Sequence, residues 1–409
     1  MDRLLLLLPT TTYRTEDFLD AARTLGVDVV CASEKPSTFE AHAPDHLLTL
    51  DFADPDAAAA RVAALAGRRP LNAVVGVDDL TTVAAAAIAE RLGLRSNPVA
   101  AVAAARDKHQ MRQCLAAAGV PVPRFRPIAL KDDPFLAARG VAFPCVLKPL
   151  ALSASRGVIR ANNVDQFIAA IRRIGALLQR ADVEAAGDAA QFLLAEQYVP
   201  GVEVALEGLR VRGTLHTLAL FDKPDPLEGP FFEETIYVTP SRLPATAQRA
   251  IEHVTAAACA ALGLDEGPVH AELRVNDAGP WVLEVAARSI GGLCSRTLRF
   301  GTGMTLEEIV LRHALGWPIA SLTRERRPAG VMMIPIPRAG RLAAVRGVEA
   351  AGAVAGIEEV AITAHAGQEL VPLPEGWQYL GFIFARADTP DAVEAALRDA
   401  HARLAFEIA

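Results

Sequence analysis

Short apolar runs alternate with segments of helical periodicity over the first hundred residues. Leu4–Leu8 is continuously apolar, which predicts a strand covered on both faces. Residues 15–25 then repeat apolar positions at helical spacing and stop at Gly26, a residue typical of helix C-termini. The alternation recurs as strands at 27–31 and 73–77 and as a helix at 81–93 with Thr81 as its N-cap. The segment 1–97 therefore predicts an open parallel α/β domain.

Strand patterns dominate the rest of the chain after two helix starts, at Asn97-Pro98 and at the cap residue Asp107. Strands are predicted at 145–148, 158–160, 192–196, 270–275, 281–285, 330–336 and 379–385, with a hairpin turn at Arg212-Gly213. Helices are predicted at 164–178, at 244–262 and from Thr389 onward, and a surface loop at 179–191. The fold class is therefore α/β followed by α+β, with a closing lobe at the end. We divide the chain into four regions, 1–97, 98–200, 201–320 and 321–409.

Composition and charge narrow the kinds of binding partner that we expect for this protein. Of the 409 residues, 52% are apolar and 22% charged, and the formal net charge is −7. No basic face favours a polyanion, so nucleic acid is not an expected partner. The five cysteines are an odd number without a C-x-x-C pair, as expected for free thiols in a reducing compartment. No apolar run approaches the roughly 20 residues of a membrane span. We expect a cytoplasmic protein that acts on small molecules and makes no membrane contact.

Two glutamates on consecutive predicted strands are the sharpest chemical signal. Glu272 and Glu284 flank a turn, and Arg288 follows four residues later. If the strands pair as a hairpin, both carboxylates can face one side and bind a hard cation such as Mg²⁺, which takes one or two carboxylates together with substrate phosphates. Two solvated strand glutamates and a surface arginine are the alternative. The apolar run WVLEVAARSIGG around them favours a functional site.

Two lysines predict a polyphosphate site. Lys148 lies in the apolar strand FPCVLKPL, where an unpaired ammonium is costly, so it requires an anionic partner, and a phosphate is a natural one. The loop LSASRGV follows at once, and its small residues and Gly157 could close over phosphate oxygens. Lys108 opens a helix behind its Asp107 cap. A solvated helix lysine is the alternative for Lys108.

The segment AEQYVPGVE predicts a nucleotide-binding edge. Glu196 ends a strand, residues 197–199 are extended before Pro200, and Glu203 follows the turn. An extended linker can offer backbone groups to an adenine, and a carboxylate just beyond it can accept two ribose hydroxyls. An ordinary hairpin connection would have the same pattern.

Four of these segments resemble, in order and spacing, the motifs of the ATP-grasp superfamily: DKHQMRQCLAAAGVPVP, FPCVLKPLALSASRGV, AEQYVPGVE and HAELRVNDAGPWVLEVAARSIGG. The resemblance covers nearly the whole chain. It points to the carboxylate-amine ligase branch, with bacterial L-amino acid ligases and carnosine synthase, and more distantly to biotin carboxylase and D-alanine:D-alanine ligase.

The resemblance implies an architecture and an activity. The architecture is an ATP-grasp fold: a Rossmann-like pre-ATP-grasp domain at 1–97, linker helices and a small lobe at 98–200, a central lobe with the metal site at 201–320, and a C-terminal closing lobe at 321–409. The activity is that of an ADP-forming ligase that uses ATP and Mg²⁺, with Mn²⁺ as an alternative. Such an enzyme joins a small-molecule carboxylate to an amine through an acyl phosphate. Amino acids are the expected substrates, and a homodimer is the expected assembly.

Residue roles follow from the same resemblance by position. Glu272 and Glu284 match the metal ligands, and Arg288 and Lys148 the catalytic cations beside the transferred phosphoryl group. The ATP-binding residues are Lys108, Lys148, Ser153, Ser155, Arg156, Gly157, Glu196, Gln197, Tyr198, Val199 and Glu203. One position departs from the pattern: many relatives have a metal-binding asparagine where this chain has Ala286. A second metal ion would therefore lack a protein ligand there.

Substrate contacts are predicted from position as well. The candidates are Asp79, Glu233, Glu234, His270, Arg288, Gly291 and Gly292. The acidic residues could bind a substrate ammonium, and the glycines could leave space for a side chain. Strand alternation puts His270 on the same face as Glu272. Structural roles in turns and core are the alternatives.

Two other functions stay open at this point. An ATP-dependent carboxylase or formate-activating transferase on the same scaffold would release ADP with bicarbonate or formate and no amino acid. A non-catalytic nucleotide-binding protein is the second. Four intact charged residues argue against it, because a protein without activity has no physical reason to keep buried charges unpaired. They are Lys148, Glu272, Glu284 and Arg288.

Overall fold

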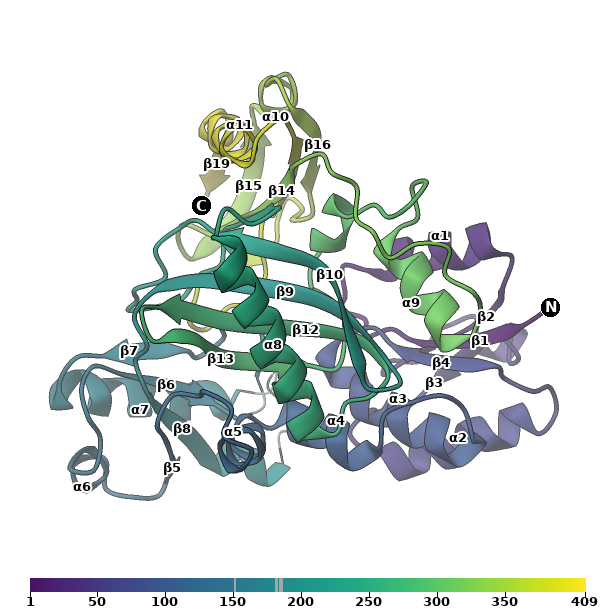
Figure 1. Cartoon of the computed structure of the whole chain (residues 1–409), viewed down its shortest axis with the longest axis horizontal. Helices are drawn as coiled ribbons and strands as arrows, with labels where there is room; N and C mark the ends of the chain where they lie inside the picture. Colours follow the sequence, from purple (N-terminus) through teal and green to yellow (C-terminus); the bar gives the residue numbers. More distant parts are fainter. Residues whose placement is uncertain (151, 181–182, 184–186) are drawn as a thin grey trace.

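A parallel sheet in the order β3-β2-β1-β4 forms the centre of the N-terminal domain in the computed structural model of the chain (Figure 1). The structure describes residues 1–150, 152–180, 183 and 187–409. Part of the surface loop expected at 179–191 lies outside them, and its last residues, Gly187–Gln191, form a 3-10 helix instead. The elements are β1 (Arg3–Leu7), α1 (Thr15–Leu25), β2 (Asp28–Ser33), η1 (Glu40–His42), β3 (Leu47–Thr49), α2 (Pro55–Ala66), β4 (Ala73–Gly76) and α3 (Asp79–Leu92). All of β1 is buried, as its apolar run predicts. The predicted parallel α/β domain is confirmed.

Helix α3 begins earlier than the sequence analysis predicts. Its N-cap is Asp78, and Thr81 is the third helical residue. The hydroxyl of Thr81 accepts a hydrogen bond from the backbone N–H of Asp78, so the two residues form a capping box. The expectation of Thr81 as N-cap was therefore wrong by three residues. The shift makes Asp79 the first residue of the helix, immediately beyond the carboxyl end of β4.

The small lobe is an antiparallel sheet in the order β5-β8-β6-β7. Its strands are β5 (Phe125–Ala129), β6 (Cys145–Pro149), β7 (Ile159–Ala161) and β8 (Phe192–Gln197). The helices of this region are α4 (Val99–Arg106), α5 (Lys108–Ala117), α6 (Pro134–Ala138), α7 (Val164–Leu178) and η3 (Gly187–Gln191). Helix α7 has the predicted bounds, and its apolar stripe, including Phe167, Ile171 and Ile174, is buried in the core of this lobe.

An eight-stranded sheet in the order β13-β12-β9-β10-β11-β14-β18-β16 forms the body of the molecule. Its strands are β9 (Val202–Val211), β10 (Thr214–Lys223), β11 (Ile236–Thr239), β12 (Gly267–Asn276), β13 (Gly279–Ala286), β14 (Ala329–Ile334), β16 (Ile357–Ile362) and β18 (Gly381–Arg386). Helix α8 (Ala245–Leu262) crosses one face of this sheet (Figure 1). Strands from 201–320 and from 321–409 thus share one sheet.

The remaining elements complete the central and C-terminal regions. They are η4 (Cys294–Thr297), α9 (Leu306–Ala314), β15 (Gly340–Arg346), α10 (Val348–Gly352), β17 (Glu369–Leu370), α11 (Pro390–Ala402) and β19 (Ala405–Ile408). Strands β17, β15 and β19 form a separate three-stranded sheet. All five cysteines are free thiols. In the described part of the chain, no helix has both the length and the apolar character to cross a bilayer.

Candidate active site

The hairpin β12–β13 places the two predicted metal ligands side by side. Its antiparallel register sets Glu272 opposite Glu284, and their side chains keep 18% and 24% of their surface exposed. Lys108, at the start of α5, brings its Nζ to 3.4 Å from a carboxylate oxygen of Glu284. Partly exposed carboxylates beside an ammonium group form a donor set that fits Mg²⁺ together with phosphate oxygens. The residues present therefore fit the metal that the sequence predicts.

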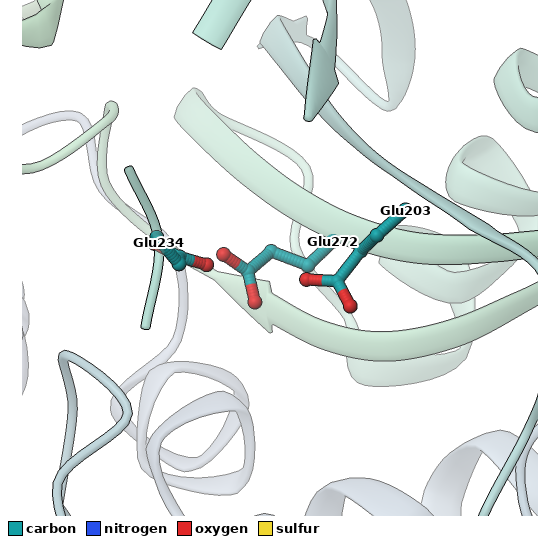
Figure 2. Close-up of side chains that lie close together, drawn as sticks. All are labelled: Glu203, Glu234 and Glu272. Atoms are coloured by element: carbon teal, nitrogen blue, oxygen red, sulfur yellow. The ribbon is translucent and has the colours of Figure 1, made fainter. Parts of the chain in front are cut away.

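Glu272 also belongs to a second acidic group. Figure 2 shows Glu203 of β9 and Glu234, which precedes β11, pointing toward Glu272; one oxygen of each carboxylate lies within 4.8 Å of the others. Between them lies the ammonium of Lys223, at the end of β10, 3.0 Å from Glu203, 2.9 Å from Glu272 and in contact with Glu234. We call Lys223 and these three glutamates the Lys223 cluster. No sequence prediction includes Lys223.

Charges within the Lys223 cluster shift one another's pKa values. Burial alone would lower the pKa of Lys223, but the charges of Glu234 and Glu272 outweigh it and hold that pKa well above its ordinary value. Burial would raise the pKa of Glu272, yet Lys223 holds it well below its ordinary value. For Glu234, burial and the charge of Glu272 raise the pKa to about 7. Glu272 is therefore ionised at neutral pH, as a metal ligand must be.

The partner of Lys148 is a protein carboxylate. Its Nζ lies 2.6 Å from Glu196, and Arg112 lies 2.6 Å from the other oxygen of the same carboxylate. Glu196 is 2% exposed and Arg112 fully buried, and Arg112 also donates to the backbone oxygen of Leu283 in β13. The anionic partner that a buried lysine requires is thus Glu196. The argument that a buried Lys148 needs a phosphate was therefore wrong, because the carboxylate of Glu196 already compensates its charge.

Arg274 of β12 connects the residues predicted to hold adenine and ribose. It donates to Glu203 at 2.9 Å, to the hydroxyl of Tyr198 at 3.0 Å and to the backbone oxygen of Val199 at 3.1 Å. The backbone N–H groups of Gln197 and Tyr198 donate to carbonyl oxygens within the protein. The hinge is therefore held in place by protein contacts, and Glu203 contacts two protein cations.

Arg288 joins the end of β13 to the N-terminal domain. Its guanidinium lies 2.8 Å from Asp79 and donates to the backbone oxygen of Ser289 at 3.0 Å. Burial would raise the pKa of Asp79, but Arg288 outweighs burial and lowers it. The fully buried Arg14, just before α1, donates to Ser289 Oγ at 2.7 Å and to Val77 O at 3.1 Å. Asp79 is thus already paired with a cation of the protein.

His270 lies where strand alternation predicts. Its Nε2 is 3.4 Å from Glu272, and its Nδ1 is 2.5 Å from Glu207, whose other oxygen accepts the backbone N–H of Ile290 at 2.9 Å. Burial alone would lower the pKa of His270, but the Glu207 carboxylate outweighs it and raises the pKa to about 9. His270 is therefore a charged link between β9 and the residues beyond β13.

The predicted phosphate loop contacts both Lys108 and the C-terminal region. Lys108 Nζ donates to Leu152 O at 2.7 Å. The backbone N–H of Gly157 donates to Pro374 O, and Arg156 Nε donates to Glu375 O, each at 2.8 Å. Arg156 is buried, Ser155 is half-buried and Ser153 is exposed. A phosphate-binding role for this loop stays a prediction, and its position beside Lys108 is compatible with it.

The remaining substrate candidates differ in their surroundings. A Cβ atom at Gly291 would meet nothing within 4 Å, whereas one at Gly292 would stand 3.0 Å from the Phe382 ring, and Gly292 has φ +58°. Glu233 is half-buried, and burial raises its pKa. The Cβ position of Gly291 is thus open, and a substrate-binding role for it stays a prediction. At Gly292 the left-handed backbone and the Phe382 ring both favour glycine.

Three family models match the chain in the order in which its regions occur. They are an ATP-grasp N-terminal domain at residues 19–95, an ATP-grasp domain at 141–297 and an L-amino acid ligase C-terminal domain 2 at 332–409. The chain belongs to the ATP-grasp superfamily.

Relatives and solved structures of the ATP-grasp superfamily agree with this assignment. Alanine–anticapsin ligase of Bacillus subtilis is 28% identical over 262 residues, which are 60% of this chain and 54% of that protein. Carnosine synthase 1 of Gallus gallus is 30% identical over 364 residues, 82% of this chain and 38% of that protein. The crystal structure of L-amino acid ligase from Bacillus licheniformis has a TM-score of 0.82 and 25% identity, and covers 100% of this chain and 99% of that one. The alignment with the first of these relatives covers about half of that protein's length.

Several buried charged residues around the candidate site are absent from the sequence predictions. The buried residues Lys223, Arg112, Arg274 and Glu207 contact predicted site residues, and the buried Arg14 contacts Ser289, next to Arg288. Lys223, Arg274 and Glu207 lie in or beside apolar strand segments, as Lys148 does. Buried charge in a strand pattern was therefore the usable signal for Lys223, Arg274 and Glu207, although the sequence could not say which partner each would meet.

Proposed function

We propose that this chain is an ATP-dependent carboxylate-amine ligase that activates a carboxylate as an acyl phosphate and joins it to an amine, with release of ADP and phosphate. One observation carries the proposal. Lys108, the Glu272–Glu284 pair and the loop ending at Gly157 lie beside one another, which is the set of groups that a metal-bridged triphosphate needs. The C-terminal family model and the ligase names of the relatives support the ligase branch.

The chemical difficulty in this reaction is the meeting of like charges. A carboxylate that attacks a triphosphate is repelled by about 4 kcal/mol per pair of unit charges at 4 Å and an effective dielectric of 20. Lys108, Lys148 and Arg288 would reduce that repulsion and hold the attacking oxygen in line. Positioning and electrostatics of this kind account for most of the catalysis in phosphoryl transfer. When Mg²⁺ is bound by Glu272 and Glu284, it supplies further neutralisation of the phosphate oxygens.

Each cation of the site contacts a carboxylate of the chain. In the absence of nucleotide, these carboxylates would hold the cations in position. Lys108 contacts Glu284 and Arg288 contacts Asp79. These pairs hold the cations in place, and each cation has further N–H groups to share with substrate oxygens. The arrangement makes Asp79 a partner that orients Arg288, and Glu233 becomes the preferred acidic residue for the substrate ammonium.

The proposed amide bond requires that the acyl phosphate meets an amine before it meets water. The phosphate loop packs against the C-terminal region through Arg156 and Gly157, and such a cover excludes solvent from the reacting atoms. Gly291, with open space at its Cβ position, is the proposed site for a substrate side chain.

A matrix of amino acid pairs, screened for ADP release in the presence of Mg-ATP, tests the function. The expected result is release that requires two substrates, one supplying a carboxylate and one an amine, with a dipeptide or amide product seen by mass spectrometry. Strong ADP release with bicarbonate or formate alone would assign the chain to the carboxylase or formate-activating class instead. No heat on titration with Mg-ATP in calorimetry would refute both.

A further inference from the structure

Lys223 has an environment that an ordinary structural ion pair does not need. Its side chain is 3% exposed, and its ammonium contacts three carboxylates from three separate segments. Glu203 is the second residue of β9, Glu272 lies on β12, and Glu234 lies on the connection before β11. A single carboxylate would neutralise a buried ammonium, yet three contact this one, and two of them have a second cationic contact, Glu203 with Arg274 and Glu272 with His270.

The geometry around the ammonium resembles that of a metal ion. One oxygen from each of the three carboxylates lies within 4.8 Å of the other two, and Figure 2 shows the carboxylate of Glu272 between those of Glu234 and Glu203. The Tyr237 ring covers the ammonium, with its centroid 5.1 Å from Nζ, and the Tyr237 hydroxyl donates to Glu234 at 2.7 Å. Carboxylate oxygens that converge in this way are the usual surroundings of a hard divalent cation.

We propose that the ammonium of Lys223 is a built-in cation that occupies the place of a divalent metal ion and fixes Glu272 and Glu203 in the orientations their roles require. Glu272 contacts Lys223 through Oε1, and in this proposal its second oxygen binds the metal ion together with Glu284. Glu203 likewise gives one oxygen to Lys223 and the other to Arg274. Lys223 thus links the predicted metal ligand to the predicted ribose carboxylate as a positioning residue. The inference has two halves. The first, that the ammonium takes the place of a metal ion, rests on the geometry alone. The second, that Lys223 positions Glu272 and Glu203 for nucleotide binding, rests on the proposed function.

A metal titration without nucleotide tests the first half. Lys223→Met keeps most of the side-chain volume and removes the charge, so three carboxylates face an empty centre. The expected result is a new site for about one Mn²⁺ per chain, at least roughly tenfold tighter than in the wild-type chain, because a divalent ion then replaces the missing charge. The signal of free Mn²⁺ in electron paramagnetic resonance measures the binding. Lys131→Met, which removes an exposed lysine of the small lobe, is the control and gains no site.

Equal Mn²⁺ affinity in the wild-type chain and in folded Lys223→Met would overturn the proposal. If repulsion between the three carboxylates prevents Lys223→Met from folding, Lys223→Met combined with Glu203→Gln leaves two facing carboxylates and carries the same expectation. A folded double variant without a gain in Mn²⁺ binding would overturn the proposal equally.

Nucleotide binding tests the positioning half. At low Mg²⁺, Lys223→Met is expected to bind Mg-ADP roughly tenfold more weakly than the wild-type chain, and Mn²⁺ at the new site or added propylammonium is expected to restore the affinity. A residue with a merely structural role would show a lowered melting temperature and no rescue by either cation. If the wild-type chain binds no Mg-ADP, the proposed function fails, while the metal titration still decides whether Lys223 is a built-in cation.

Discussion

Carboxylates of the chain hold all three cations that the proposed reaction uses. The pairs are Lys108 with Glu284, Lys148 with Glu196, and Arg288 with Asp79. Two of these carboxylates differ in whether they can also bind a metal ion. Glu284 keeps 24% of its side chain exposed and can bind a metal ion, whereas Glu196 is 2% exposed and faces only protein cations. Substitution of Glu284 and substitution of Glu196 are therefore expected to have different consequences.

Glu284→Gln removes one of two metal-binding carboxylates and leaves the fold intact, because the side chain is partly exposed and keeps its shape. ADP formation is expected to fall at least roughly 100-fold, since a neutral amide neither neutralises nor holds the ion as a carboxylate does. A coupled assay of ADP release measures the loss, and circular dichroism checks the fold. Glu90→Gln, at an exposed position of α3, should keep wild-type turnover. Wild-type turnover in Glu284→Gln would remove the metal assignment.

Glu196→Gln is expected to act on stability, with a defined pH dependence. Burial would raise the pKa of Glu196, but Arg112 and Lys148 outweigh it and hold the pKa below its ordinary value of 4.5. A lowered folded-state pKa stabilises the fold above pH 4.5, and this contribution is lost as the pH falls through the folded-state pKa. At pH 7 the variant should lose about 3 kcal/mol of unfolding free energy, because two buried cations lose their carboxylate.

Urea unfolding of the wild-type chain and of Glu196→Gln between pH 7 and pH 3.5 measures this difference. The gap between the two proteins should be largest near neutrality and shrink below pH 4.5. The exposed Glu369 supplies the control, since Glu369→Gln should change stability little at any pH. A gap that stays constant down to pH 3.5 would contradict the assigned ionisation of Glu196.

At the scale of elements, helix α5 carries Lys108 as its first residue, and its cap determines where that lysine points. The Asp107 side chain accepts the backbone N–H groups of His109 and Gln110. Helix α2 has a comparable cap in Asp54, which accepts the N–H of Ala57, but α2 carries no residue of the candidate site. The two caps form a matched pair for separating stability from function.

Asp107→Ala and Asp54→Ala are each expected to lower the unfolding free energy by about 1 kcal/mol, the usual cost of a lost N-cap. Only Asp107→Ala should also weaken Mg-ATP binding, because the frayed first turn no longer fixes Lys108 beside Glu284. Denaturant unfolding gives the first quantity and calorimetry the second. Equal nucleotide affinity in the two variants would show that the cap does not position Lys108.

Elements with strong local signals could be predicted from the sequence, and contacts between distant elements could not. Helix α7 has its predicted bounds because the Asn163 cap and a regular apolar stripe specify them. The hairpin that sets Glu272 opposite Glu284 was predictable from two strand patterns and a short turn. By contrast, the pairing of Lys148 with Glu196 depends on the neighbouring strands β6 and β8, and the contacts of Lys223 with Glu203, Glu234 and Glu272 on how β9, β10 and β12 associate. Such register is a property of tertiary packing and has no local signature.

At the scale of the whole molecule, the small lobe and the C-terminal region meet at the phosphate loop. Arg173 of α7 donates to both carboxylate oxygens of Glu375, at 2.5 and 2.9 Å. The backbone oxygens of Pro374 and Glu375 accept from Gly157 and Arg156 of the phosphate loop. One turn of the C-terminal region, residues 372–376, therefore holds both a helix and the phosphate loop of the small lobe.

Two substitutions in this turn are expected to affect ATP use to different extents. Glu375→Gln removes only a half-exposed ion pair, worth at most about 1 kcal/mol, so the KM for ATP should rise roughly two- to fivefold. Gly376→Ala should have a larger effect, roughly tenfold or more, because its Cβ would stand 1.7 Å from Val371 O and the turn must move away from the loop. Asp399→Asn, which breaks the exposed pair with Arg403 in the same region, is the control and should leave KM unchanged.

Steady-state kinetics with ATP varied measure all three, and limited proteolysis should cut residues 152–157 faster in Gly376→Ala. An unchanged KM together with unchanged proteolysis in that variant would show that the turn does not hold the loop over the site.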